Sequence, residues 1–368
     1  MYRESYKNKK VLITGNTGFK GAWLTVWLLK LGAKVYGVSK DIPTQPSMFD
    51  ELDLKNKITH YEEDVRELNS IYEIINKVKP DFVFHLAAQA LVSISYKDPI
   101  ETISTNVLGT VNILEALKKS NHKCVAVIIT SDKCYDNIES VWGYKETDRL
   151  GGKDIYSGSK AAAEIIFNSY YNSFFKEDNS NVKIATTRAG NVIGGGDWAK
   201  DRIIPDSIRA WSQNQIVEIR SPKATRPWQH VLEPLSGYLT LGDNLLFEEK
   251  INGENFNFGP NSQYSHSVED IIRDISKQWN FEDSSKAYTI TDNVKFHEAG
   301  LLKLNCDKAL FHLKWLPTLS YKDLIKFTGS WYFNYYKNGK NMFEYTIFQI
   351  EEYENIAIDK GMKWTIKK

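Results

Sequence analysis

Cysteine is scarce in this chain, with three residues in 368, and no two of them form a CxxC pair. An odd number at such spacings excludes a disulfide framework and a cysteine-based zinc site, and it is typical of a reducing compartment. Net charge is almost absent as well, because 47 lysines and arginines stand against 46 aspartates and glutamates. No overall field would draw the chain onto nucleic acid or an anionic membrane, so we expect a small molecule as its partner.

Long hydrophobic runs are also missing. The first ten residues, MYRESYKNKK, are polar and lead directly into the strand-like VLIT, without the apolar core of a signal peptide. The most apolar helical stretch, residues 22–31, is about half of the ~20 residues that a membrane span needs. We therefore expect a cytoplasmic protein with no metal site, no nucleic-acid partner and no membrane segment.

What the chain does have is the composition of a globular protein, with 42% hydrophobic and 25% charged residues. Apolar runs rich in β-branched residues alternate with helical patterns through the first half. Such runs suit a parallel sheet with helices on both faces, so we predict an α/β fold with a Rossmann-type doubly wound sheet. The expected strands are residues 10–14, 34–38, 58–61, 82–86, 125–130 and 183–187.

After residue 187 the regular alternation gives way to turn-rich stretches. We expect residues 1–187 to form the Rossmann domain, with 231–257 returning to it. Residues 188–230 and 258–368 are then expected to form a smaller, interleaved C-terminal domain that binds the substrate.

The clearest motif is a glycine-rich turn, in which VLIT runs into Gly15, Gly18 and Gly21 at GxxGxxG spacing and then into a helical stretch. Three glycines allow a tight turn and bring backbone N–H groups against a pyrophosphate at the positive end of a helix. The flanking strand and helix favour this interpretation over a merely tight turn. At the end of the second strand Ser39 and Lys40 replace the acid that would mark NAD, so the choice between NAD and NADP stays open.

A second motif combines a hydroxyl, a phenol and an ammonium. A tyrosine and a lysine four residues apart share one helix face, where the ammonium can lower the pKa of the phenol from about 10. The pattern YxxxK occurs four times, and only Tyr156 and Lys160 open a good helix after the strand 125–130. That strand leads into Ser131, which can hydrogen-bond the substrate oxygen that Tyr156 deprotonates. Asp132 and Lys133 follow at once and indicate a step beyond oxidation.

These motifs together resemble the extended, sugar-nucleotide-modifying form of the short-chain dehydrogenase/reductase superfamily. Segments that include TSDKCYDN, RAGNVIGGGDWAKDRIIPD and RPWQHVLEPLSGYL resemble the CDP-glucose 4,6-dehydratase family, over roughly residues 9 to 335. Related dTDP-glucose dehydratases carry Asp-Glu after the hydroxyl residue. Here Lys133 replaces the second acid, as the CDP-glucose branch implies.

The resemblance implies a lyase that converts CDP-D-glucose to CDP-4-dehydro-6-deoxy-D-glucose and water, for polysaccharide biosynthesis. The implied steps are oxidation at C4 by NAD, elimination across C5 and C6, and return of the hydride to C6. Tyr156 would take the proton of the C4 hydroxyl, with Ser131 and Lys160 beside it. Asp132 is the expected acid at the C6 oxygen, and a partly desolvated Lys133 the expected base at C5, although the division of these two roles stays open.

Contacts to cofactor and substrate are also implied by the resemblance. The cofactor contacts are Gly15, Thr17, Gly18, Phe19, Gly21, Ser39, Asp64, Val65, Leu86, Ala87, Ala88, Gln89, Tyr156 and Lys160. The expected substrate contacts are Asn191, Arg202, Arg226 and His297, of which the two arginines would clamp the diphosphate. A homodimer or higher homo-oligomer is expected through the apolar helical stretches 100–117 and 161–171.

Two other interpretations share these features. A dehydratase or epimerase of the same superfamily that acts on a GDP-, UDP- or dTDP-sugar would carry the same turn and the same Tyr-Lys pair. A non-catalytic NAD(P)-sensing Rossmann protein would need only the fold. The base of the nucleotide is therefore the least determined part of the hypothesis.

Overall fold

The centre of the larger lobe is a seven-stranded sheet, in a computed structural model that describes residues 3–177, 180–261, 266–281, 283–291 and 301–365. Every neighbouring pair of its strands runs parallel. In spatial order the strands are β11 (Asn255–Phe258), β6 (Val182–Ala189), β5 (Cys124–Ile129), β4 (Phe82–His85), β1 (Lys10–Thr14), β2 (Lys34–Ser39) and β3 (Thr59–Glu62). All six expected strands lie in this sheet, which confirms the doubly wound α/β fold.

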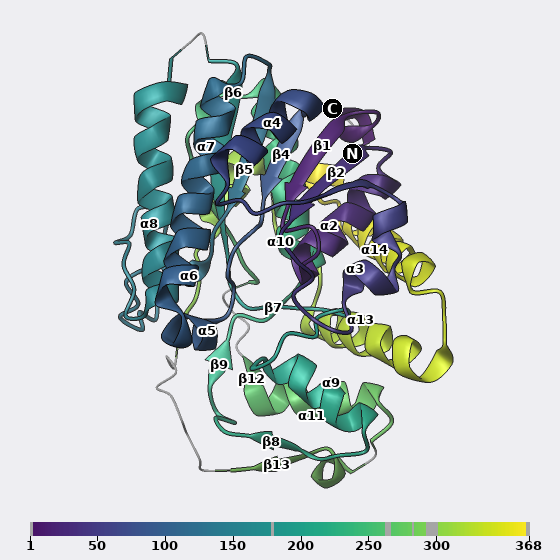
Figure 1. Ribbon diagram of the computed structural model, residues 1–368. Coiled ribbons are helices and arrows are strands. Elements are labelled where there is room, and N and C mark those ends of the chain that lie inside the picture. The colour runs from purple at the N-terminus through teal and green to yellow at the C-terminus, as the bar shows by residue number, and fades with distance from the viewer. Residues whose placement is uncertain (1–2, 178–179, 262–265, 282, 292–300, 366–368) are drawn as a thin grey trace.

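Helices cover both faces of the sheet because its strands are apolar on both sides. In β1, Val11 and Ile13 join one core, and Leu12 between them joins the other. One face carries α2 (Phe19–Lys30), α10 (Leu232–Phe247) and α14 (Met342–Asp359), and the other carries α4 (Leu68–Val78), α7 (Gly109–Lys119) and α8 (Ile155–Tyr170) (Figure 1). Between β4 and α7 lie α5 (Val92–Lys97), α6 (Pro99–Ile103) and a π-helical stretch, Ser104–Leu108.

A smaller lobe of short elements follows the carboxyl end of β6 (Figure 1). Its elements are β7 (Val192–Ile193), α9 (Ile203–Ser212), β8 (Val217–Ile219), β9 (Thr225–Arg226), β10 (Gln229–His230), β12 (His266–Ser267), α11 (Val268–Gln278), β13 (Tyr288–Ile290) and α13 (Tyr321–Phe333). The strands pair as β7 with β10, β8 with β13 and β9 with β12.

The last helices return to the larger lobe. α12 (Asp307–Leu313) packs on β11, and α14 packs on α2. In the second contact the Glu354 carboxylate accepts a hydrogen bond from the Trp27 indole at 2.9 Å and pairs with Lys30 at 2.8 Å. Both helices belong to the stretch that the sequence assigned to the substrate domain, and both contact elements of the sheet lobe.

A buried carboxylate ties α8 to the strand ends. Glu164 of α8 accepts hydrogen bonds from Thr130, which follows β5, and from Thr186 of β6. It also accepts one from Asn255 of β11 at 2.8 Å, and Arg188 of β6 pairs with it at 2.8 Å. Burial alone would raise the pKa of Glu164, but Arg188 and the hydroxyl donors hold this pKa below its ordinary value. The contacts therefore fix α8 against three strands of the sheet.

Within the described ranges, no helix is both long enough and apolar enough to cross a membrane. The same residues contain no group of three or more histidines, cysteines, aspartates or glutamates placed to hold a metal ion. The three cysteines, Cys124, Cys134 and Cys306, are free.

Replacing Arg188 with leucine should leave Glu164 buried without its cation. We expect the free energy of unfolding to fall by about 3–5 kcal/mol, because breaking a buried ion pair leaves one buried charge without a partner. Urea unfolding followed by circular dichroism measures this loss. The control is Arg273→Leu, which breaks a half-exposed pair with Asp270 and should cost no more than about 1 kcal/mol. Equal losses in the two variants would contradict the importance of the buried pair.

Candidate active site

The glycine turn between β1 and α2 is packed so closely that two of its positions accept only glycine. Gly15 has a positive φ of 75°, and a Cβ there would lie 2.7 Å from the backbone nitrogen of Ala87. A Cβ on Gly21 would lie 2.1 Å from the carbonyl oxygen of Gly15. By contrast, a Cβ on Gly18 would lie no closer than 3.4 Å to any other atom. The turn is therefore not closely packed at Gly18, where α2 begins. Phe19 then begins α2 without a side-chain cap on its first turn, which fits an anion bound by backbone N–H groups.

The turn is tied to the end of β2. The Ser39 hydroxyl accepts a hydrogen bond from the backbone N–H of Thr17 at 3.3 Å and donates one to Asn16 at 2.9 Å. The Thr17 hydroxyl donates to the carbonyl of Asp41 at 2.8 Å. Ser39 and Thr17, both expected to contact the cofactor, therefore lie side by side. Their hydrogen bonds hold the glycine turn against the end of β2.

The loop after β4, which includes Leu86, Ala87 and Ala88, forms the opposite wall of the turn. The backbone N–H of Ala87 donates to the Thr14 hydroxyl at 3.2 Å. Gln89 is held through its backbone by Asn106, whose side chain also donates to the Ser159 hydroxyl at 2.9 Å. Asn106 thus connects the expected cofactor loop to α8. No sequence motif marks Asn106, since one asparagine in an apolar helical stretch gives little signal.

Asp64 and Val65 follow β3. Val65 is buried, and its carbonyl accepts a hydrogen bond from Asn112 at 3.0 Å. The Asp64 carboxylate is bound by Arg66, through the backbone N–H at 2.9 Å and through the guanidinium at 2.6 Å. The side chain of Asp64, expected to contact the adenine, therefore already has a strong partner in the protein.

Ser131, Tyr156 and Lys160 come together where β5 ends and α8 begins. Asp154 starts α8 by accepting hydrogen bonds from the backbone N–H and the hydroxyl of Ser157 at 2.9 and 2.7 Å. The Tyr156 phenol lies near the Ser131 hydroxyl, which works to lower the pKa of the phenol, and the Lys160 ammonium lies 6.0 Å from the centre of the Tyr156 ring. The structure therefore brings the expected hydroxyl, phenol and ammonium into one site.

The ionisation of this site is governed by burial. Removal from water raises the pKa of Tyr156 to about 12, although the nearby Ser131 hydroxyl works in the opposite direction. Burial also lowers the pKa of Lys160 to about 8. The expected lowering of the phenol pKa is thus absent in the protein alone, because desolvation outweighs the nearby charges.

Asp132 is a buried carboxyl group directly beside Ser131. It is 2% exposed, and burial raises its pKa even though Lys133 and Ser131 oppose the shift. One carboxylate oxygen accepts a hydrogen bond from the Ser131 hydroxyl at 3.0 Å, and the other has no hydrogen-bond partner among the described residues. A Cβ on Gly190 would lie 3.1 Å from that second oxygen.

Lys133, in contrast, is exposed, so the partial desolvation expected for it is not found.

Lys20 is a further charged group of the site, and it was not among the residues expected there. It lies in the first turn of α2, and burial lowers its pKa to about 8, assisted by the charge of Arg202 and opposed by that of Asp132. A charged side chain inside the glycine turn was the available signal. The site therefore holds two lysines, Lys20 and Lys160, whose ammonium form is destabilised.

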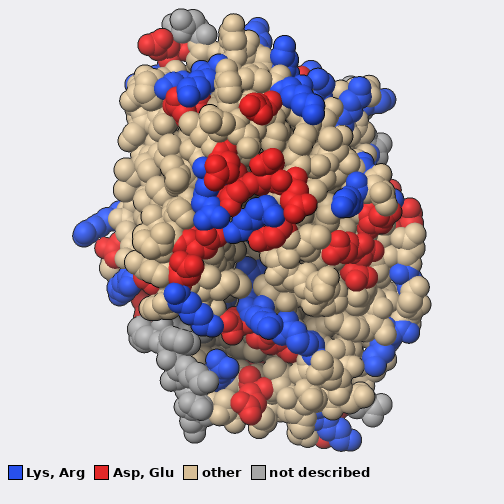
Figure 2. Space-filling model, viewed as in Figure 1, with Lys and Arg blue, Asp and Glu red and all other residues tan. Residues whose placement is uncertain are grey.

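The expected substrate contacts are only partly brought together. Arg202 precedes α9, pairs with Asp197 at 2.8 Å, and its charge acts on Tyr156. Arg226 lies in β9 and donates to the carbonyl of its neighbour Thr225 at 2.9 Å. The remaining two are Asn191, whose carbonyl accepts from Gln229 at 3.1 Å, and His297, which lies outside the described residues. Figure 2 shows a hollow between the two lobes, with acidic and basic side chains gathered above it.

Comparison with known proteins gives consistent results. The family model for GDP-mannose 4,6 dehydratase matches residues 12–328. CDP-glucose 4,6-dehydratase of Salmonella typhimurium is 45% identical over 333 residues, which cover 89% of this chain and 92% of that protein. dTDP-glucose 4,6-dehydratase of Haemophilus influenzae is 23% identical over 88% of this chain and 97% of that protein.

Solved structures show the same fold. UDP-glucose 4-epimerase of Thermotoga maritima, solved with UDP-glucose, has a TM-score of 0.75 at 21% identity and covers 89% of this chain and 99% of its own. dTDP-glucose 4,6-dehydratase of Bacillus anthracis, solved with NAD, has a TM-score of 0.71 at 20% identity and covers 88% of this chain and 96% of its own. These likenesses extend over both lobes of the molecule.

Replacing Lys160 with methionine should stabilise the fold at neutral pH. The folded pKa of about 8 lies below the usual 10.5, so below pH 8 the folded protein carries a buried ammonium that is easier to hold in the unfolded chain. This cost shrinks as the pH rises from about 8 to about 10.5, and the advantage of Lys160→Met in the free energy of unfolding should shrink with it. Urea unfolding at about pH 7 and about pH 9.5 measures both values.

The control for this experiment is Lys326→Met, which removes an exposed lysine whose pKa is raised by Glu352. Its effect on unfolding should be the same at both pH values, because Lys326 stays charged throughout the interval. A Lys160→Met advantage that is absent, or that grows with pH, would contradict the assigned burial of the ammonium.

Proposed function

We propose that this chain, which belongs to the GDP-mannose 4,6-dehydratase family of nucleotide-sugar enzymes, converts CDP-D-glucose to CDP-4-dehydro-6-deoxy-D-glucose and water. The observation that carries the proposal is the buried carboxyl group of Asp132, whose pKa is raised by burial, beside Ser131, Tyr156 and Lys160. A sugar dehydratase needs such an acid to release the C6 hydroxyl as water, whereas an epimerase has no leaving hydroxyl to protonate. The 45% identity with the Salmonella enzyme supports CDP-glucose as the substrate.

NAD is the proposed cofactor, and relatives of the same fold have been solved with it. The glycine turn fits its pyrophosphate, because Gly18 leaves an open side at the start of α2. When bound, NAD⁺ would supply a positive charge and the acceptor that takes hydrogen from C4 and returns it to C6. Ser39 and Thr17 would line the adenosine side, and Ala87 and Ala88 the nicotinamide side.

Tyr156 is the proposed base at the C4 hydroxyl. Its phenol is protonated in the protein alone, since burial raises its pKa to about 12. A phenolate therefore forms only when positive charge is brought into the site, and Lys160 and Lys20 can add to that charge when they are protonated. Ser131 would hold the substrate oxygen in line with the phenol by hydrogen bonding.

Asp132 and Lys133 are proposed for the elimination. The C4 ketone acidifies the proton on C5, a base removes that proton, and the C5–C6 double bond forms as the C6–O bond breaks. Asp132 would give its proton to the departing oxygen, which leaves as water. Lys133 is the proposed base on its position in the motif, and its exposure lends that role no support.

The diphosphate of the substrate is expected to lie near Arg202, whose positive charge acts to lower the pKa of Tyr156. Arg226 and Asn191 are proposed as further residues that bind the sugar nucleotide. A role for His297 at the base of the nucleotide remains a proposal from the sequence.

We also propose that two copies of the chain associate through α6, the π-helical stretch after it, and α8. Large apolar side chains are exposed on these helices, among them Ile100 at 73% and Ile165 at 54%. An exposed apolar surface of this kind is typical of a protein interface.

The substrate assignment is tested by incubating the purified protein and NAD⁺ with CDP-, dTDP-, UDP- and GDP-activated hexoses. We expect one product, formed from CDP-glucose, whose mass corresponds to the loss of water. Efficient conversion of a different nucleotide sugar would move the proposal to that substrate. Inversion of a hydroxyl without loss of water would contradict a dehydratase.

Two substitutions should separate the steps. Tyr156→Phe should reduce turnover by about 100-fold or more, because no base is left at C4, while cofactor binding changes little. Asp132→Asn should slow the loss of water by about the same factor, so that an oxidised sugar nucleotide that still carries its C6 hydroxyl accumulates. Mass spectrometry of quenched reactions distinguishes the two, and identical product patterns would remove the reason for assigning them different roles.

A further inference from the structure

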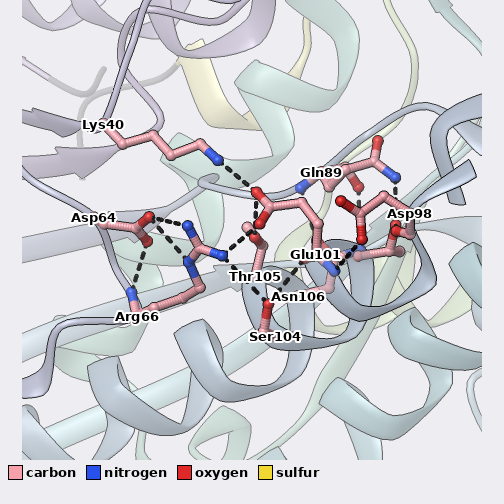
Figure 3. A network of polar contacts seen from close by, with 10 residues as sticks. Lys40, Asp64, Arg66, Gln89, Asp98, Glu101, Ser104, Thr105 and Asn106 are labelled. Carbon is pink, nitrogen blue, oxygen red and sulfur yellow. Dashed lines mark hydrogen bonds and ion pairs between the residues drawn. The ribbon is translucent and has the colours of Figure 1, made fainter.

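A network of alternating charges lies at the end of β2. Lys40 pairs with Glu101 of α6, Glu101 pairs with Arg66, and Arg66 pairs with Asp64 at 2.6 Å (Figure 3). The network therefore contains two cations and two carboxylates and has no net charge.

Its place in the fold connects it to the proposed cofactor. Lys40 directly follows Ser39, the last residue of β2, whose hydroxyl contacts the glycine turn. In Rossmann folds the end of the second strand lies beside the adenosine ribose, where an acid binds the 2′-hydroxyl of NAD or a cation binds the 2′-phosphate of NADP. Here a cation stands at this position, with a carboxylate bound to it.

The network is held in place from several sides. The backbone N–H of Glu101 donates to Asp98 at 2.9 Å, and the Thr105 hydroxyl donates to the Glu101 carboxylate at 3.3 Å. The carbonyl of Arg66 accepts a hydrogen bond from Asn112 at 2.7 Å. The side chains are partly buried, with Glu101 24% and Arg66 30% exposed, so solvent screens the charges only in part.

We infer that Glu101 acts as an internal counter-ion that makes this site select the 2′-hydroxyl of NAD over the 2′-phosphate of NADP. The inference rests on the proposed cofactor role and adds a residue that decides between the two dinucleotides. A 2′-phosphate carries close to two negative charges. To bind Lys40 or Arg66 it would have to displace Glu101 and lie beside that carboxylate and Asp64. A neutral 2′-hydroxyl meets no such repulsion.

Removing one charge of either sign should therefore shift the binding of NADP⁺ in opposite directions. Glu101→Gln leaves the network with a net positive charge, because it frees Lys40 and leaves Arg66 paired with Asp64 alone. NADP⁺ should therefore bind about tenfold or more tightly than to the wild type. Lys40→Gln leaves a net negative charge and should weaken NADP⁺ binding by roughly threefold. The affinity for NAD⁺ should change by less than about threefold in both variants, because its ribose is neutral.

Isothermal titration calorimetry of the full chain, freed of bound nucleotide, measures both dinucleotides directly and does not depend on turnover. The matched control is Glu352→Gln, which breaks an exposed pair with Lys326 on the C-terminal helices and should change neither affinity. The wild type should bind NAD⁺ at least about tenfold more tightly than NADP⁺.

The inference is overturned if the wild type binds both dinucleotides equally, or if Glu101→Gln leaves their ratio of affinities unchanged. Should Glu101→Gln fail to fold, Lys40→Gln still decides, since an unchanged ratio in that exposed variant contradicts the charge balance. A wild type that binds neither dinucleotide would instead refute the proposed cofactor, and this result is distinguishable from binding without selectivity.

Discussion

The buried carboxylate of Glu164 is the interaction on which the arrangement of the active site depends. It lies on the same helix as Tyr156 and Lys160 and accepts its hydrogen bonds from residues in or beside β5, β6 and β11. Ser131 continues from the end of β5, next to Thr130. A rotation or shift of α8 would leave a buried charge and several buried hydrogen-bond donors without their partners, which is costly inside a protein. The distance between the phenol and the Ser131 hydroxyl is therefore set by a contact that takes no part in the chemistry.

The reactive end and the adenosine end of the proposed cofactor site differ in the charge state of their side chains. At the reactive end, burial raises the pKa values of Asp132 and Tyr156 and lowers those of Lys20 and Lys160, so it favours the neutral form of each group. At the adenosine end, Lys40, Glu101 and Arg66 remain charged and are neutralised by one another. The first arrangement prepares proton transfers, and the second discriminates between ligands of different charge.

The sequence predicted the parts of the molecule that depend on local patterns. Alternating apolar runs predicted the strands of the sheet, and the chemistry of neighbouring residues predicted the glycine turn and the set Ser131, Tyr156 and Lys160. It did not predict Glu101, Asn106 or Glu164, because their partners lie on segments that are distant along the chain. The pKa of Tyr156, the exposure of Lys133 and the return of α14 to the sheet lobe depend on packing in three dimensions, which no local pattern records.

The central claim is that one site oxidises a glucosyl carbon, releases water, and returns the same hydrogen two carbons along. CDP-glucose carrying deuterium at C4 tests it most directly, when the reaction is run in ordinary water and the product is examined by nuclear magnetic resonance and mass spectrometry. The account predicts that the deuterium is found in the new methyl group at C6 of the same molecule. Deuterium that is lost to solvent, or that stays at C4 of the product, would contradict it.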